Sequence, residues 1–392
     1  MMKTVALATT LVVAAPVVAQ EAQKVGAPAQ AKSEIDLARD RMIAAKRNRV
    51  YYNNVFDLSG LPNYTPETKV SGLIRMRGAN YFTDSPLAER WAEEFRKWHP
   101  DVRFDFQLRS SQHAISSLIY GVSDISPLGR AITNAERLAF QREFNYQPFG
   151  VIAVTGSQSL SGWNPAVAIL VNKRNPLAKL SMEQLDGIFG SRRTGGWTGI
   201  DWDPSIARGP EKDIRKWGQL GLRGKWANKP IRVLGYTLKY NFPDEIHNKV
   251  FHGGYKWNDA LEEYSNKTNP DGSLYLAGDQ MMAEVARSPD AIAYATGVLA
   301  TLDPNVKALP LSVTPKGPAV YPTIENVQNR SYPLAGEVFF YMNRKPGTAL
   351  DPKVKEFMRY VLSREGQAQV MRDGKYLPLT AALAKEGRDA LE

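Results

Sequence analysis

The sequence predicts a two-lobed α/β fold in which each lobe holds a mainly parallel, doubly wound sheet. Compact apolar runs at 150–155 and 167–172 are typical of strands that are buried on both faces. Such runs alternate along the chain with helical segments, which is the pattern of parallel sheets. A turn rich in Gly, Ser and Trp at 156–165 separates the two runs and suits a crossing between lobes.

Length and composition agree with this fold class. The 392 residues are enough for two or three domains at roughly 150 residues each. The absence of cysteine excludes a disulfide framework, thiolate metal sites, cysteine catalysis and a cysteine-linked lipid anchor. With 50 Lys and Arg against 40 Asp and Glu, the net charge is +10. This charge leaves nucleic acid, a membrane surface or a small anion as partners.

The first twenty residues have the pattern of a targeting segment. A lysine at position 3 precedes an apolar run that ends in small residues, Val17-x-Ala19. We expect residues 1–19 to be a signal peptide that is cleaved before Gln20; the alternative is a buried N-terminal helix. No stretch reaches the roughly 18 apolar residues of a membrane span. The sequence therefore predicts a bacterial periplasmic protein with no lipid anchor and no direct membrane insertion.

Residues 20–68 are expected to form a polar preamble. The spacing of its apolar residues predicts an amphipathic helix over 33–49. Those apolar residues are Ile35, Leu37, Met42 and Ile43.

The α/β pattern begins after the preamble with a strand at 73–77. A helix over 86–98 follows, in which Leu87, Trp91 and Phe95 recur at i, i+4 and i+8. The other predicted strands are 102–106, 124–126, 150–155, 167–172, 231–234, 291–294 and 338–341. The other predicted helices are 115–120, 182–189, 212–219, 243–251, 279–287 and two within 351–373.

Signatures of catalysis and of nucleic-acid binding are missing from the sequence. It contains no GxSxG, P-loop, HExxH or GxGxxG motif. His247 and His252 are five residues apart, which does not place them on one helix face for a zinc pair. The basic residues are scattered and form no helical stripe. We therefore predict a protein that is not an enzyme and that has no cofactor, no metal site and no nucleic-acid partner.

Two hydroxyl-rich loops open predicted helices. Thr83, Asp84 and Ser85 lie between a strand and a helix, and Ser110 and Ser111 recur in the same context. Free N–H groups at such helix ends attract anions, although each loop alone is explained by helix capping. Because ligands bind at the carboxyl ends of the strands in open α/β sheets, the two loops together predict an anion site.

Several longer stretches carry a resemblance to a known family. They are Pro86–Phe95, the turn Gly121-Val-Ser-Asp-Ile125, Ala166–Leu177 with Leu180–Phe189, and Tyr332–Asn343 with Leu362–Leu379. On these residues the chain resembles the periplasmic phosphate-binding proteins of ABC transporters, and more broadly the two-lobed substrate-binding protein superfamily. The resemblance covers roughly residues 70–380.

The resemblance implies a periplasmic-binding-protein fold with a hinge between the lobes. Lobe 1 is expected at 69–148 plus 300–392, and lobe 2 at 149–299.

The resemblance also implies ligand-binding positions. Thr83 matches the first-loop hydroxyl of the family, Ser111 the second-loop serine, and Arg232 the arginine ahead of a Ser-Gly-Thr motif. That motif is replaced here by Tyr236-Thr237-Leu238.

A second departure is Gly129, which stands where the family has an acceptor aspartate or serine. The neighbouring Arg130 is a candidate replacement partner for the anion. Tyr81, Phe82, Trp163 and Tyr236 near these loops indicate either ordinary packing or a larger ligand such as an organic phosphate.

The expected function is capture of an oxyanion by a monomeric periplasmic protein. The ligand would be phosphate or a phosphate-bearing molecule, and the partner the membrane component of an ABC transporter. The alternative is a non-transport sensor or scaffold that keeps the fold and docks a partner protein through residues 21–68 or 194–229.

Overall fold

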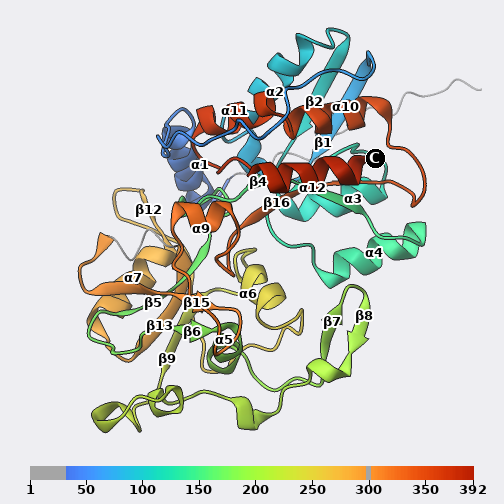
Figure 1. The fold of residues 1–392 in the computed structure, drawn as a ribbon. Coiled ribbons are helices and arrows are strands. Elements are labelled where there is room, and N and C mark those ends of the chain that lie inside the picture. Colours follow the sequence, from blue (N-terminus) through green and yellow to red (C-terminus); the bar gives the residue numbers. More distant parts are fainter. Residues whose placement is uncertain (1–31, 297–301) are drawn as a thin grey trace, which may run out of the picture. The chain divides into compact units, whose positions relative to one another are not determined.

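The computed structural model describes residues 32–296 and 302–392, and residues 34–392 form one compact unit. Figure 1 shows its helices and strands. The helices are α1 (Glu34–Lys46), α2 (Leu87–Arg96), α3 (Ala114–Ile119), α4 (Asn134–Phe144), α5 (Met182–Phe189), α6 (Pro243–Lys249), α7 (Ala277–Arg287), α9 (Ile324–Gln328), α10 (Pro352–Val361), α11 (Arg364–Asp373) and α12 (Ala381–Leu391). The strands are β1 (Gly72–Arg77), β2 (Val102–Gln107), β3 (Ser126–Leu128), β4 (Phe149–Thr155), β5 (Val167–Asn172), β6 (Leu180–Ser181), β7 (Gly196–Thr198), β8 (Asp201–Asp203), β9 (Arg232–Tyr236), β10 (Glu262–Tyr264), β11 (Lys267–Thr268), β12 (Leu274–Tyr275), β13 (Ala291–Thr296), β14 (Val306–Leu309), β15 (Leu311–Ser312) and β16 (Glu337–Met342). The predicted signal peptide at 1–19 lies outside the described residues.

The strands form two main groups, each mainly parallel with one reversed strand. In the first group β1 pairs parallel with β2, a parallel bridge joins Met76 to Ile125, and β16 lies antiparallel between β3 and β4. In the second group the order is β10-β9-β13-β5-β14, and only β5 runs against its neighbours. These pairings confirm the predicted α/β fold class. The reversed strands, β5 and β16, each follow a segment in which the chain passes from one group to the other.

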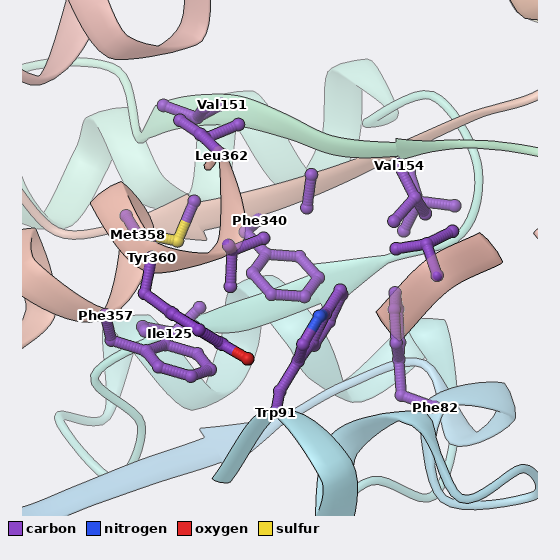
Figure 2. Packing of buried hydrophobic residues seen from close by; sticks show 14 of the residues in the cluster. Phe82, Trp91, Ile125, Val151, Val154, Phe340, Phe357, Met358, Tyr360 and Leu362 are labelled. Carbon is purple, nitrogen blue, oxygen red and sulfur yellow. The ribbon is translucent and has the colours of Figure 1, made fainter. Parts of the chain in front are cut away.

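An aromatic core holds the first group of strands together with α2 and the C-terminal helices. Leu87, Trp91 and Phe95 are buried along one face of α2, as their spacing predicts. Figure 2 shows the side chain of Trp91 next to Phe340 of β16, with Phe82 nearby; the ring centroid of Phe340 lies 6.0 Å from that of Trp91 and 5.2 Å from that of Phe82. The indole N–H of Trp91 donates to the carbonyl of Gly366 at 2.8 Å, which ties α2 to α11.

A second core surrounds the five-stranded sheet. Every residue of β5 is buried, as its continuous apolar run predicts. The buried hydrophobic residues between 309 and 335, including Val327 of α9 and Leu334, belong to this second core. The chain therefore returns to the first core after residue 335, later than the boundary at 299/300 that the sequence analysis expects. The division into lobes stays a prediction.

Two crossing segments, 156–166 and 334–336, run side by side between the two cores. The N–H of Gly156 donates to the carbonyl of Gly336 at 2.9 Å, and the N–H of Val167 donates to the carbonyl of Leu334 at 3.0 Å. A Cβ on either glycine would lie 2.1 Å from the carbonyl oxygen of Asn164. The close approach of these backbones therefore requires glycine at both positions.

The remaining expectations hold for most elements, with two corrections. The segment 212–219 is not an α-helix; it runs from the last residue of one 3-10 turn, Pro210–Lys212, into a second, Trp217–Leu220. Gly221, with φ of 87°, ends the second turn. The predicted preamble helix forms as α1, but its Ile35 and Leu37 are 41% and 44% exposed, so these two residues do not face a core.

The rest of the preamble packs on the C-terminal part of the chain. The N–H groups of Tyr51 and Tyr52 both donate to the carbonyl of Gly374, at 2.9 Å and 3.0 Å. The hydroxyl of Tyr64 donates to Glu356 at 2.8 Å. Residues 34–68 are thus an integral part of the compact unit.

Candidate functional site

A cavity of about 1030 Å³ lies where the loops after several parallel strands meet. One side is lined by the loops after β1, β2 and β3, and another side by the loop after β9. The crossing segment at 159–165, helix α1 with residues 49–52, and the start of α7 also contribute to the lining. This is the position at the carboxyl ends of strands where the sequence analysis expects a ligand.

Four of the nine predicted site residues line this cavity. They are Ser110, Ser111, Arg130 and Tyr236. The other five, which are not among the lining residues, are Thr83, Asp84, Ser85, Arg232 and Thr237.

The first predicted loop uses its polar groups locally. The hydroxyl of Thr83 donates to the carbonyl of Asn80 at 3.0 Å. Ser85 is fully buried and accepts from the N–H of Leu87 at 3.3 Å, but the N-cap residue of α2 is Pro86. Asp84 bonds to the side-chain amide of Asn80. This loop therefore shapes the start of α2 rather than the lining of the cavity.

The second predicted loop contributes hydroxyls to the cavity. Ser110 accepts from the N–H of Gln112 at 3.3 Å, and Ser111 accepts from the N–H of Gly129 at 3.1 Å. Both oxygens act as acceptors in these bonds. Among the described residues, no acceptor is found for either hydroxyl hydrogen, so each is available to donate to a bound oxyanion.

Arg130 lines the cavity but is already surrounded by acceptors. Its guanidinium forms a bidentate pair with Glu136 at 2.7 Å and 2.8 Å. It also donates to the carbonyl of Ala131 at 3.0 Å, and its Nε lies 3.3 Å from the carboxylate of Asp244. Two carboxylates neutralise this cation, which weakens its attraction for a further anion.

Arg232 lies at the other end of β9 from the cavity. It is the first residue of β9, and Tyr236, which lines the cavity, is the last. The two residues are four positions apart along the strand, which corresponds to roughly 13 Å. The guanidinium pairs with Glu262 at 2.6 Å and with Glu284 at 2.9 Å. Its position in the sequence resembles that of an anion-binding arginine, but its contacts are those of a structural ion pair.

The ring of Tyr236 belongs to the aromatic lining of the cavity, whereas its neighbour Thr237 is not a lining residue. The Tyr236 ring packs on Phe242 at 4.6 Å and on Tyr294 at 5.8 Å between centroids. Burial raises the pKa of the Tyr236 phenol, which keeps the hydroxyl neutral and able to donate. The backbone N–H of Thr237 donates to the carbonyl of Tyr264 at 2.8 Å, which fixes the end of the strand.

Sequence reasoning missed the contribution of α1 to this site. Residues Arg39 and Lys46 of α1, and Arg49 just after it, line the cavity. The available signal was the helical spacing of Ile35, Arg39 and Lys46, which puts them on one face. Counting all lining residues, six cations face three carboxylates. The cations are Arg39, Lys46, Arg49, Arg109, Arg130 and Lys239, and the carboxylates are Asp36, Glu245 and Asp279.

The described residues offer no cluster of three or more potential metal ligands. Within the same ranges, no helix is both long enough and apolar enough to span a membrane.

Comparison with known proteins gives consistent matches. A family model described as a PBP superfamily domain matches residues 63–365. The chain is 30% identical over 327 residues to the phosphate-binding protein PstS of Pseudomonas aeruginosa, covering 83% of this chain and 89% of that protein. Protein SphX of Synechococcus elongatus is 23% identical over 300 residues, covering 76% and 75%. The crystal structure of PstS from Borrelia burgdorferi has a similar fold, with a TM-score of 0.52 at 13% identity, covering 79% of this chain and all of that one.

Proposed function

The chain belongs to the PBP superfamily and, within it, to the family of the PstS proteins, and from this premise we propose that it captures an oxyanion for an ABC transporter. The ligand is phosphate or a molecule that carries a phosphate group, since the relative from Pseudomonas aeruginosa is a phosphate-binding protein. The protein acts by binding and release, without catalysis.

One observation carries this proposal: six cations line the cavity at the carboxyl ends of the strands, and among the described residues only two of them, Arg39 and Arg130, have a carboxylate within 4.0 Å. An oxyanion that leaves water needs donors and positive charge to replace its hydration. Ser110 and Ser111 supply hydroxyls, while Lys46 and Lys239 supply ammonium groups. A cavity with this composition favours an anion over a neutral or cationic ligand.

We propose as lobes the two parts that hold the two cores, joined by the crossing segments 156–166 and 334–336. Direct contacts already link the two sides of the cavity. The amide of Gln112 donates to Asn241 at 3.3 Å, and Arg130 pairs with Asp244. A ligand that touches both sides stabilises the closed arrangement, which is the form that a transporter recognises.

The same proposal places the protein in the periplasm. It rests on the pattern of residues 1–19 and on membership of this family. The membrane component of an ABC transporter is the proposed partner, and the protein is proposed to act as a monomer. Residues 34–68 pack on the rest of the chain. This packing supports an intramolecular role for the segment rather than the docking of a partner protein.

The test is isothermal titration calorimetry on the mature chain, with inorganic phosphate and phosphate monoesters as ligands and sulfate and a neutral sugar as controls. We expect one site per chain for at least one phosphate-bearing ligand. In Ser111→Ala that affinity falls about ten-fold, because one hydroxyl donor to the anion is lost. Absence of heat with every phosphate-bearing ligand, together with native mass spectra that show no co-purified anion, would falsify the proposal.

A further inference from the structure

Helix α1 is fastened to both sides of the cavity. On the side of the first core, Nη2 of Arg47 donates to both carboxylate oxygens of Glu89 of α2, each at 2.8 Å. On the side of the second core, Arg41 donates to the carbonyl of Gly272 at 2.6 Å. Gly272 lies in the turn between β11 and β12, the two strands that α1 contacts. The helix, some of whose residues line the cavity, is therefore held by contacts on both of its sides.

One face of α1 is turned toward the cavity. At 100° per residue, Ile35, Arg39 and Lys46 lie within about 40° of one another around the helix axis. All three line the cavity. Arg41, which anchors the helix, points about 140° away from Lys46 by the same geometry. The anchoring contacts and the cavity-lining contacts thus use different faces, so the lining cations are not needed to hold the helix.

Lys46 is a half-buried lining cation, whereas Arg49, Arg109 and Lys239 are exposed. Among the described residues, no carboxylate lies within 4.0 Å of the Lys46 ammonium group. Burial lowers the pKa of Lys46, while the more distant Asp279 opposes this effect. Arg39 differs, since its guanidinium lies 3.8 Å from Asp84 and over the ring of Tyr81. An anion beside Lys46 would replace the hydration that this ammonium group has lost.

The size and the aromatic lining of the cavity exceed what an inorganic anion uses. Pockets for organic ligands measure about 300–1,000 Å³, and this cavity measures about 1030 Å³. Seven aromatic side chains line it, among them Tyr81, Tyr236, Tyr240 and Phe242. Aromatic faces stabilise rings and apolar groups, whereas inorganic phosphate has neither.

We propose that α1 is a wall of the ligand site and that the site takes a phosphate monoester with a ring-bearing organic group, whose phosphate lies beside Lys46 and whose ring packs on the tyrosines. The inference rests on the proposed function, because it names the class of phosphate-bearing ligand that the same cavity holds. Arg39, which stacks on Tyr81, orders the aromatic wall next to the phosphate position.

The experiment is calorimetry on the full mature chain with four probes: inorganic phosphate, adenosine 5′-monophosphate, glucose 6-phosphate and adenosine. We expect a monoester to bind at least ten-fold more tightly than inorganic phosphate, and adenosine not to bind. In Lys46→Gln the affinity for that monoester falls about ten-fold or more, because a charge-assisted contact is lost. Lys385→Gln on α12, which removes an exposed lysine paired with Asp389, is the control and keeps the wild-type affinity.

The possible results distinguish a failure of this inference from a failure of the proposed function. If inorganic phosphate binds more tightly than both monoesters, the proposed function stands and the monoester assignment is overturned. If a monoester binds best but Lys46→Gln keeps its affinity, α1 is not a wall of the site. If no phosphate-bearing probe binds, the proposed function itself fails. Thermal unfolding of Lys46→Gln at the wild-type temperature confirms that the variant is folded.

Discussion

The guanidinium of Arg130 lies 3.3 Å from the carboxylate of Asp244, and this ion pair joins the loop after β3 to helix α6 on the other side of the cavity. Arg130 also holds Glu136, the residue that completes the capping box of α4. The pair therefore couples the position of α6 to the first core. Burial raises the pKa of Asp244 to about 6, with Glu136 and Glu245 adding to the effect and Arg130 opposing it.

This raised pKa predicts a pH-dependent stability. A folded-state pKa of about 6 for Asp244 exceeds the unfolded value of about 3.9, so the folded state binds the proton more tightly. The contribution of this carboxyl to the free energy of unfolding is therefore largest below about pH 4 and falls as the pH rises toward 6. In Asp244→Asn this fall, of about 3 kcal/mol, disappears.

Urea unfolding of wild type and Asp244→Asn at several pH values between 4 and 7 measures the effect. The difference between the two free energies should change across this range and become constant above it. Glu263→Gln, which removes a carboxylate that accepts only from the N–H of Leu238, is the control. A difference that does not vary with pH would show that Asp244 titrates normally.

For Arg232 we predict a structural effect without an effect on binding. Its ion pairs with Glu262 and Glu284 are about one third exposed, so Arg232→Gln should lower the free energy of unfolding by only about 1 kcal/mol. Affinity for a phosphate-bearing ligand should stay at the wild-type value, because Arg232 is not a lining residue. Calorimetry and urea unfolding on the same preparation separate the two readouts. Lost affinity at unchanged stability would restore the anion-binding role that the resemblance implies.

Arg232 was predicted as a site residue but does not line the cavity, whereas Lys46 lines it and was not predicted. Apolar spacing predicts buried elements such as β5 and the Leu87, Trp91 and Phe95 face of α2, because burial leaves a direct periodic signal. Loops at strand ends predict the place of the cavity for a similar reason. The place of Lys46 in the cavity lining was missed because it depends on where a helix outside the α/β pattern packs, which is a tertiary property. The segment 212–219 was misassigned because local glycine and proline geometry outweighs helical spacing there.

Arg47 is predicted to hold α1 in place. Arg47→Gln removes the pair with Glu89 and the bond to the carbonyl of Thr83. Since the pair is partly exposed, the loss in global stability should be at most about 1 kcal/mol. The local effect should be larger, with faster hydrogen exchange of the amides in 36–46 and little change elsewhere.

Hydrogen exchange followed by mass spectrometry measures this difference peptide by peptide. Lys97→Gln is the matched control, because it removes an ion pair with Glu94 within the same α2 region without touching α1. Equal exchange of α1 in Arg47→Gln and in wild type would mean that the contacts with β11 and β12 alone keep the helix docked.

The crossing segments approach each other closely at Gly156 and Gly336. Gly156→Ala and Gly336→Ala would each place a Cβ 2.1 Å from the carbonyl oxygen of Asn164, so each should lower the free energy of unfolding by about 1–3 kcal/mol. Gly129→Ala, whose Cβ would lie 3.5 Å from the hydroxyl of Ser111, is the control and should change stability little. Because both substitutions displace the same atom, the double variant should lose less than the sum of the two single losses. Strict additivity in urea unfolding would mean that the two segments respond independently, and that Asn164 does not link them.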